Sequence, residues 1–363
     1  MRRLLVTGGA GFIGANFVRY WRREHVGDRI VVLDALTYAG NLSSIESALS
    51  SPQMRFVHGS ICDNPLVERL LVEEGINTIV HFAAESHVDR SISGPDAFID
   101  TNVVGTHSLL KAARKVWLEE ARLVDHRFHH VSTDEVYGSL GPDDPPFHEE
   151  TPYAPNSPYS ASKAGSDHLV RAYHHTYGLD ITTSNCSNNY GPYQFPEKLI
   201  PLTVLNALHG KRLPIYGDGM NVRDWLYVED HCQAIDRILA NGTPGRTYNV
   251  GGRSERTNRQ VVGALCEIID AEFSESPELA AYYPDCPAAR KGSCRALIEF
   301  VPDRPGHDRR YAINSSRIEE ELGFHSARTF ADGLAITVRW YLRSRSWWAP
   351  LSKWAHCNSD LLP

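Results

Sequence analysis

A tyrosine and a lysine four residues apart, Tyr159 and Lys163, are the pair of side chains with the clearest chemical potential in this sequence. Pro158 precedes them, as in the first turn of many helices, and side chains four residues apart share a helix face. An ammonium group beside a phenol favours the phenolate, whose pKa is about 10 in water. Such a tyrosine can accept the proton of an alcohol while a hydride leaves the adjacent carbon. The pair therefore predicts a redox step at a hydroxyl-bearing carbon.

A second group of reactive side chains, Thr133-Asp134-Glu135, directly follows an apolar run. Ligands bind at the carboxyl ends of strands in parallel sheets, so these residues could face a substrate. Two neighbouring carboxyls can differ in protonation, because like charges push one pKa upward. One acid and one base are what the elimination of water requires. The alternative is a solvated acidic turn, but the position after Ser132 and before Tyr159 favours chemistry.

A glycine-rich segment near the start of the chain predicts a dinucleotide site. Gly8, Gly11 and Gly14 stand between an apolar run and a helical pattern. They allow a tight turn, a close approach to a diphosphate and close packing of helix on strand. Asp34 follows 20 residues after Gly14, at the end of the next apolar run. A carboxylate there accepts hydrogen bonds from ribose hydroxyls and repels a 2′-phosphate, so NAD is favoured over NADP.

The elements that position these residues alternate along the first half of the chain. Short apolar runs predict strands at Leu4–Thr7, Ile30–Leu33, Arg55–Val57, Thr78–Phe82 and His129–Ser132, and helical spacing lies between them at Ile13–Arg23, Leu66–Glu74 and Asp96–Trp117. This pattern predicts an α/β protein with a Rossmann-like, doubly wound parallel sheet.

The second half of the chain is richer in proline and glycine. We predict a NAD-binding domain over residues 1–187 that includes the reactive residues. A smaller C-terminal domain over 188–363 would bind the substrate, with some segments returning to the sheet. Ser274–Arg295 has no clear period and is expected to form a long surface excursion.

Composition excludes several classes of protein. The net charge is 37 − 44 = −7, which lacks the basic footprint of a nucleic-acid binder. No apolar run is long enough to cross a bilayer, and the first residues lack the apolar core of a secretory signal. We therefore expect a cytoplasmic protein without a membrane or nucleic-acid partner. The seven scattered cysteines form no Cys-x-x-Cys pair, so we expect buried free thiols and no metal site.

Several longer motifs extend this interpretation. The sequence resembles the extended short-chain dehydrogenase/reductase family, and within it the 4,6-dehydratases of nucleotide sugars. The matching stretches include residues 36–41 (LTYAGN), 83–91 (AAESHVDRS), 132–138 (STDEVYG), 185–192 (NCSNNYGP), 197–201 (EKLIP), 223–225 (RDW) and 303–308 (DRPGHD). The Asp-Glu pair separates these dehydratases from epimerases of the same family.

The resemblance implies a redox-neutral cycle on a small-molecule nucleotide sugar, dTDP-glucose, with NAD as cofactor. Tyr159, assisted by Lys163, would oxidise carbon 4 of the sugar, while Thr133 binds the carbon 4 oxygen. Glu135 would then remove the carbon 5 proton, and Asp134 would protonate the departing carbon 6 hydroxyl. The hydride returns to carbon 6, which gives a 4-keto-6-deoxy sugar.

The resemblance also implies binding residues. Those for NAD are Gly8, Gly11, Phe12, Ile13, Gly14, Asp34, Leu36, Thr37, Ile61, Phe82, Ala83, Ala84, Thr101, Tyr159, Lys163 and Asn189. Those for the nucleotide sugar are Ser86, Thr133, Asn188, Lys198, Leu199, Pro214, Tyr216, Arg223, Asn258, Arg304 and His307. No metal ligand is expected.

Some alternatives stay open at this point. Ser60 stands where the family usually has aspartate, and His356 where it often has tyrosine. A dehydratase acting on UDP-glucose and a nucleotide-sugar 4-epimerase are rivals within the same fold. A non-catalytic NAD-binding protein is a rival of another class, although it would not need Thr133, Tyr159 and Lys163 together. Asp96–Trp117 and Asn156–Tyr177 are expected to form the paired helices of a homodimer.

Overall fold

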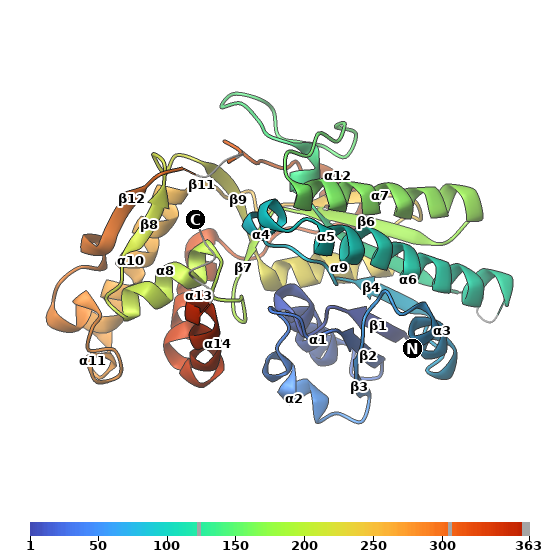
Figure 1. Cartoon of the computed structure of the whole chain (residues 1–363), viewed down its shortest axis with the longest axis horizontal. Coiled ribbons are helices and arrows are strands. Elements are labelled where there is room, and N and C mark those ends of the chain that lie inside the picture. The colour runs from blue at the N-terminus through green and yellow to red at the C-terminus, as the bar shows by residue number, and fades with distance from the viewer. Residues whose placement is uncertain (122–124, 304–306, 358–363) are drawn as a thin grey trace.

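A computed structural model describes residues 1–121, 125–303 and 307–357, with side chains described as far as Leu351. Its largest element is a parallel sheet of seven strands in the order β10-β6-β5-β4-β1-β2-β3 (Figure 1). The strands are β1 (Arg3–Thr7), β2 (Arg29–Asp34), β3 (Met54–His58), β4 (Thr78–His81), β5 (Arg127–Thr133), β6 (Ile181–Cys186) and β10 (Thr247–Val250). The predicted Rossmann-like fold is confirmed.

Side chains of the central strands alternate between two helical layers. Leu4 and Val6 of β1 pack in the cluster that includes residues of α1 (Phe12–Glu24) and α9 (Val228–Asn241). Leu5 lies in the opposite cluster, with residues of α3 (Asn64–Glu73), α6 (Thr106–Ala113) and α7 (Pro158–Tyr177). Because both faces are covered, these strands are apolar throughout, which is why they could be read from sequence.

The segment predicted as one helix over Asp96–Trp117 is divided. It begins as α5 (Asp96–Phe98), continues as a π-helical segment η2 (Ile99–Gly105), and is followed by α6 and a second π-helical segment η3 (Arg114–Glu119). Wider turns of this kind often occur at functional sites, and Thr101 stands in the first of them.

Helix α7, which carries the tyrosine and the lysine, has strong signals at both ends. Ser157 and Ser160 form a reciprocal capping box, with Pro158 in the first turn. Gly178 ends the helix in the left-handed conformation, at φ 73°. These local signals fix where the helix begins, and therefore place Tyr159 in its first turn and Lys163 one turn later.

The second half of the chain forms two smaller sheets and their covering helices (Figure 1). One sheet has the order β11-β9-β7 and the other pairs β12 with β8. Helices α8, α10 and α13 pack in a separate core with them. The bounds are β7 (Asn188–Tyr190), α8 (Leu199–Leu208), β8 (Leu213–Tyr216), β9 (Val222–Tyr227), β11 (Glu255–Thr257), α10 (Asn258–Glu275), β12 (Ile298–Val301), α12 (Ser316–Leu322), α13 (Phe330–Arg343) and α14 (Arg345–Cys357). Strand β10 returns to the large sheet, while the domain boundary at residue 187 stays a prediction.

The stretch 274–295 differs from the expected surface excursion. It contains the end of α10, the short helix α11 (Leu279–Tyr282) and the 3-10 turns η5 (Pro287–Arg290) and η6 (Cys294–Leu297). Tyr283, Cys286 and Cys294 are buried in the second core. Short helices carry too few turns for a hydrophobic period, so sequence patterning could not detect this packing.

The remaining short elements complete the chain. They are η1 (Leu42–Ser44), α2 (Glu46–Leu49), α4 (Val88–Ser93) and η4 (Asp134–Tyr137). Of the six cysteines whose side chains are described, five are buried free thiols, as expected, and Cys62 is exposed. Among the described helices, none has the length and apolar character needed to span a bilayer.

Candidate active site

The predicted chemical residues gather where the central parallel strands end. The strands β1, β2, β4, β5 and β6 run parallel, so their carboxyl ends meet at one edge of the sheet. Thr7, Asp34, His81, Thr133 and Cys186 end these strands. The glycine segment after β1 and the Asp134-Glu135 pair after β5 therefore belong to one edge, as the sequence predicted.

The glycine segment forms a cradle that fits a dinucleotide. Gly8 has φ 68°, and a Cβ there would lie 2.6 Å from the Ala83 backbone nitrogen. A Cβ at Gly14 would overlap the carbonyl oxygen of Gly8. No side chain caps the start of α1 at Gly11, so backbone N–H groups at this helix terminus are available to an anion. Phe12 and Ile13 form the first turn of α1.

Asp34 is held in place at the end of β2. Its side chain accepts hydrogen bonds from the backbone N–H of Ala10 at 2.9 Å and of Leu36 at 2.8 Å. Leu36 itself has φ 50°, an uncommon conformation that brings its N–H to the carboxylate. Burial raises the pKa of Asp34, and the two backbone donors lower it. The result is a fixed carboxylate beside the glycine cradle, suited to ribose hydroxyls.

The other predicted cofactor contacts lie on several elements. Phe82 follows β4 and packs against Phe17 of α1 with ring centroids 5.2 Å apart. Asn189 has its amide engaged by His231 Nδ1 at 2.9 Å and by the Ser187 carbonyl at 3.0 Å. The remaining positions lie in the loops after β2, β3 and β4 or in η2, and they are Thr37, Ile61, Ala83, Ala84 and Thr101.

The surroundings of Tyr159 differ from the expectation of a phenol whose pKa is lowered by lysine. Burial raises the pKa of Tyr159 well above 10, the charge of Glu135 raises it further, and a hydrogen bond with Thr133 lowers it. Lys163 instead donates from Nζ to the Val131 carbonyl at 2.9 Å. Burial and a nearby carboxylate thus determine the pKa of the phenol. This is an effect of tertiary packing, which the spacing of Tyr159 and Lys163 alone could not reveal.

The two adjacent carboxyls occupy different environments. Asp134 is 2% exposed, and its Oδ2 has no hydrogen-bond partner among the described residues. Burial raises the pKa of Asp134 well above its ordinary value, and Glu135 and Asp224 raise it further. Glu135 is only half-buried, and its N–H donates to Thr133 Oγ1 at 3.3 Å. These surroundings favour the protonated form of Asp134, and its Oδ2 has no hydrogen-bond partner among the described residues.

Two predicted substrate residues meet near the loop after β4. Lys198 donates from Nζ to the Ser86 carbonyl at 3.1 Å, which brings together positions 112 residues apart. Arg223 is buried, donates to the Asp308 carbonyl at 2.9 Å, and stacks over Tyr311 at 4.5 Å. The structure thus brings Lys198 to Ser86 and fixes Arg223 near Asp134, whose pKa it lowers.

A second group of predicted substrate residues lies along the small sheet of β8 and β12. Tyr216 is 40% exposed, and its ring centroid lies 6.5 Å from that of His307. His307 Nδ1 lies 2.6 Å from Asp303 Oδ1. Pro214 is on β8, Leu199 begins α8, Asn258 begins α10, and Asn188 begins β7 with an unpartnered buried Oδ1 among the described residues. Arg304 and the side chain of His356 lie outside the described residues.

Two buried carboxyls beside the predicted site were missed. The Asp224 carboxylate accepts hydrogen bonds from the backbone N–H groups of Gly252 at 2.9 Å and Ser254 at 2.5 Å. Its charge is close enough to Asp134 to raise the pKa of Asp134. Asp167 lies four residues after Lys163, a spacing that could have flagged it as sharing a helix face. Ser60, the departure noted in the sequence, accepts from the Cys62 N–H at 3.1 Å and so caps its own turn.

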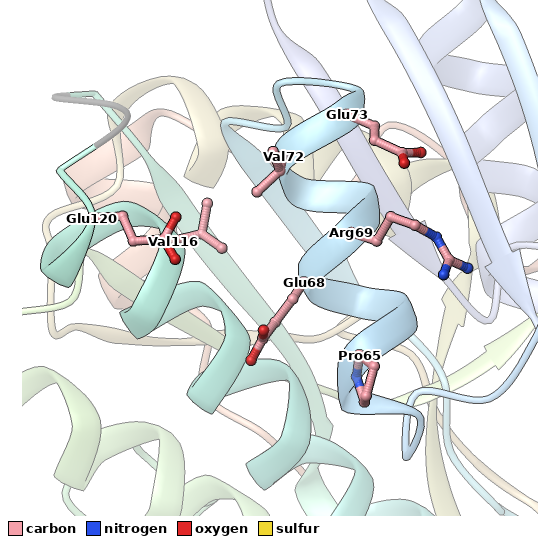
Figure 2. A pocket seen from close by; sticks show the side chains of 7 residues that line it. All are labelled: Pro65, Glu68, Arg69, Val72, Glu73, Val116 and Glu120. Carbon is pink, nitrogen blue, oxygen red and sulfur yellow. The ribbon is translucent and has the colours of Figure 1, made fainter.

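A shallow hollow on the outer helices is separate from this edge. It lies between α3 and η3 and is lined by Pro65, Glu68, Arg69, Val72, Glu73, Val116 and Glu120, as Figure 2 shows. Glu68 at its border forms an ion pair with Lys115. The hollow holds none of the predicted reactive residues. Within the described part of the chain, no group of three or more His, Cys, Asp or Glu side chains is arranged to hold a metal ion.

The fold and this edge define a class of nucleotide-sugar-modifying enzyme within the extended short-chain dehydrogenase/reductases. The chain belongs to the family described as GDP-mannose 4,6 dehydratase, which matches residues 5–337.

The relatives at higher identity carry a more specific name. A dTDP-glucose 4,6-dehydratase of Xanthomonas campestris pv. campestris (strain B100) is 56% identical over 349 residues, which are 96% of this chain and 95% of that protein. The crystal structure of DesIV, a dTDP-glucose 4,6-dehydratase from Streptomyces venezuelae with NAD and TYD bound, has a TM-score of 0.84 at 49% identity and covers 96% of this chain and 99% of its own. A UDP-glucose 4-epimerase of Thermotoga maritima has a TM-score of 0.80 at 25% identity, covering 94% and 99%. The fold is thus shared with epimerases, and the higher identity lies with dehydratases.

Proposed function

We propose that this protein is a NAD-dependent hydro-lyase that converts dTDP-glucose into dTDP-4-keto-6-deoxyglucose and water. The observation that carries the proposal is the buried Asp134, beside Glu135 and close to Tyr159, whose pKa is raised and whose Oδ2 has no hydrogen-bond partner among the described residues. An acid and a base at adjacent positions suit the removal of a proton and a hydroxyl from adjacent carbons. Relatives at about 50% identity with this activity support the assignment.

Tyr159 and Thr133 would carry the first step. Tyr159, as the phenolate, would take the proton of the carbon 4 hydroxyl, while Thr133, already hydrogen-bonded to Tyr159, binds the carbon 4 oxygen. Bound NAD would supply a positively charged ring and a place to hold the hydride between the first and last steps. Lys163 places a second positive charge near this end of β5.

The elimination step would fall to the carboxyl pair. Oxidation at carbon 4 acidifies the carbon 5 proton, which Glu135 removes as a base. Asp134 donates its proton to the carbon 6 hydroxyl, which leaves as water. The hydride then reaches carbon 6 and a proton returns to carbon 5, so the sugar loses only water and no net oxidation occurs.

Binding would use the two groups of residues already placed. The cofactor would occupy the glycine cradle and Asp34, with the other predicted contacts in the loops after β2, β3 and β4. The nucleotide sugar would extend from Ser86 and Lys198 toward Tyr216 and His307. The partly exposed Tyr216 ring is suited to stack on a base.

Two rival activities share this fold. A 4-epimerase would need no acid for a leaving hydroxyl, so the burial and the raised pKa of Asp134 argue against it. A dehydratase acting on UDP-glucose would use the same chemistry and differ only in the base that is bound. A non-catalytic NAD-binding protein would leave both sugars unchanged.

Parallel incubation with dTDP-glucose and UDP-glucose separates these possibilities. We expect dTDP-glucose to give a 4-keto product, which absorbs in alkali, and UDP-glucose to react far more slowly. A faster reaction with UDP-glucose would show that the enzyme prefers the UDP sugar. Formation of a galactose epimer would show that the reaction is an epimerisation. No change in either sugar would refute an enzymatic role on them.

We further propose a cytoplasmic homodimer. Ile92, Ile99 and Val104, on α4 and η2, are about half exposed, at 51%, 48% and 49%. We infer that these exposed apolar side chains belong to a face that a partner covers. A second copy that packs its own α6 and α7 against these elements would cover them. The buried free thiols suit a reducing compartment.

A further inference from the structure

Asp167 lies one turn after Lys163 on α7 and is surrounded by donors from other segments. Its Oδ2 accepts from Ser132 Oγ at 2.8 Å and from the Tyr153 hydroxyl at 3.0 Å. Its Oδ1 lies 3.0 Å from His130 Nε2. The residue is 6% exposed. Three donors around one buried carboxyl show that Asp167 is an integral hydrogen-bond acceptor of the interior.

Lys163 needs a counter-charge, because its ammonium group is almost fully buried. The residue is 3% exposed, and its Nζ donates to the neutral carbonyl of Val131 at 2.9 Å. An ionised group in such a setting is costly without an opposite charge nearby. Burial lowers the pKa of Lys163, and the charge of Asp167 raises it. In turn, burial raises the pKa of Asp167 to about 6, and Lys163 lowers it.

Five other titratable groups around this pair have pKa shifts that favour their neutral forms. Burial holds the pKa of His81 and of His130 well below 6.5 and raises the pKa of the Cys186 thiol to about 12. Burial also raises the pKa of the Tyr137 and Tyr153 phenols above 10. His168 faces Asp167 from the same helix. Asp167 is therefore the negative charge that can balance Lys163.

The same carboxyl joins the two elements that carry the reactive residues. Ser132 directly precedes Thr133 at the end of β5, and α7 carries Tyr159. The contact network continues from Tyr153 to Asn185 Nδ2 at 3.2 Å, from Asn185 to the Tyr137 hydroxyl at 2.9 Å, and from there to Asn249 at 2.8 Å. A displacement of α7 against β5 would break several of these bonds together.

We propose that Asp167 is a positioning residue that acts as the counter-charge of Lys163 and fastens the end of β5 to α7. It touches neither substrate nor cofactor and acts through Lys163 and Ser132. Its effect on turnover rests on the proposed function, whereas its effect on the charge of Lys163 does not.

The test is a direct titration of Lys163 in the full-length chain. Brief labelling with acetic anhydride at pH 6 to 11, read by peptide mass spectrometry, follows the unprotonated amine. Loss of an opposite charge lowers the pKa of an ammonium group, so Asp167→Asn should move the Lys163 midpoint down by about one pH unit. Tyr153→Phe removes a hydrogen bond and keeps the charge, and Asp167→Glu restores the charge, so both should keep the wild-type midpoint. If Asp167→Asn does not fold, Asp167→Ser leaves room for water beside the three donors and gives the same comparison.

Turnover of dTDP-glucose supplies a second measurement. In Asp167→Asn, kcat should fall at least about ten-fold with KM unchanged within about two-fold, and the alkaline limb of kcat should move to lower pH by the same amount as the labelling midpoint. A Lys163 midpoint equal to that of the wild type would overturn the proposal. If the wild-type enzyme leaves dTDP-glucose unchanged, the proposed function fails, and the labelling titration still decides the role of Asp167.

Discussion

Asp134 and Glu135 are neighbours in the chain but differ in burial, and this difference divides their chemistry. Asp134 is buried and its pKa is raised, while Glu135 is half-buried and close enough to Tyr159 to raise the pKa of the phenol. The proposed division into acid and base follows from these surroundings. Two substitutions test it separately.

Glu135→Gln removes the base and keeps the size of the side chain. Oxidation at carbon 4 should still occur, whereas removal of the carbon 5 proton should slow by at least about 100-fold. Enzyme-bound NADH should therefore accumulate, and absorbance near 340 nm in a stopped-flow experiment measures it. Tyr159→Phe is the matched control, since it should abolish even this first absorbance change. Unchanged turnover by Glu135→Gln would refute the role.

Asp134→Asn removes the proton that the leaving hydroxyl needs. Turnover of dTDP-glucose should fall by about 100-fold or more. A substrate analogue with fluoride at carbon 6 needs no acid, because fluoride departs as an anion, so this analogue should restore much of the rate. Because an acid must be protonated to act and the pKa of Asp134 is raised, the wild-type rate on dTDP-glucose should also fall as the pH rises through that pKa. Equal defects on both substrates would argue that Asp134 has a structural role instead.

At the scale of the elements, the stretch 274–295 contributes to the second core. The buried Tyr283 hydroxyl donates to the Leu342 carbonyl at 2.8 Å, which links this stretch to α13. Tyr283→Phe should lower the free energy of unfolding by about 1 kcal/mol, because it leaves a buried carbonyl without its donor. The neighbouring Tyr282 is 61% exposed, so Tyr282→Phe is the control and should change little. Urea denaturation measures both, and equal effects would contradict this account of the packing.

Sequence patterns predicted some of these elements well and others poorly, for physical reasons. The strands β1 and β2 are buried on both faces, so their apolar runs could be predicted from the sequence. The glycine spacing before α1 could be predicted as well, because it reflects steric contacts such as that of Gly8 with Ala83. The stretch around Cys286 and Cys294 was not, because its short turns have no period. The raised pKa of Tyr159 depends on burial and on Glu135, which only the assembled fold brings near.

At the scale of the whole molecule, the proposed homodimer can be tested on the apolar side chains of η2. Light scattering after size exclusion should give about twice 40.6 kDa for the wild type at micromolar concentration. Val104→Glu places a charge at the proposed interface and should shift the protein toward monomer. Val26, which is 67% exposed in the loop after α1, provides the control Val26→Glu, which should stay dimeric. A monomeric wild type would reject the proposal.

The whole account depends on a hydride that leaves carbon 4 and arrives at carbon 6 of the same sugar. Deuterium placed at carbon 4 of dTDP-glucose follows this transfer, with unlabelled dTDP-glucose present in the same reaction. The account predicts that mass spectrometry and NMR find the deuterium at carbon 6 of the 4-keto product, with none on product from the unlabelled sugar. Deuterium lost to water, retained at carbon 4, or shared between the two product pools would contradict it.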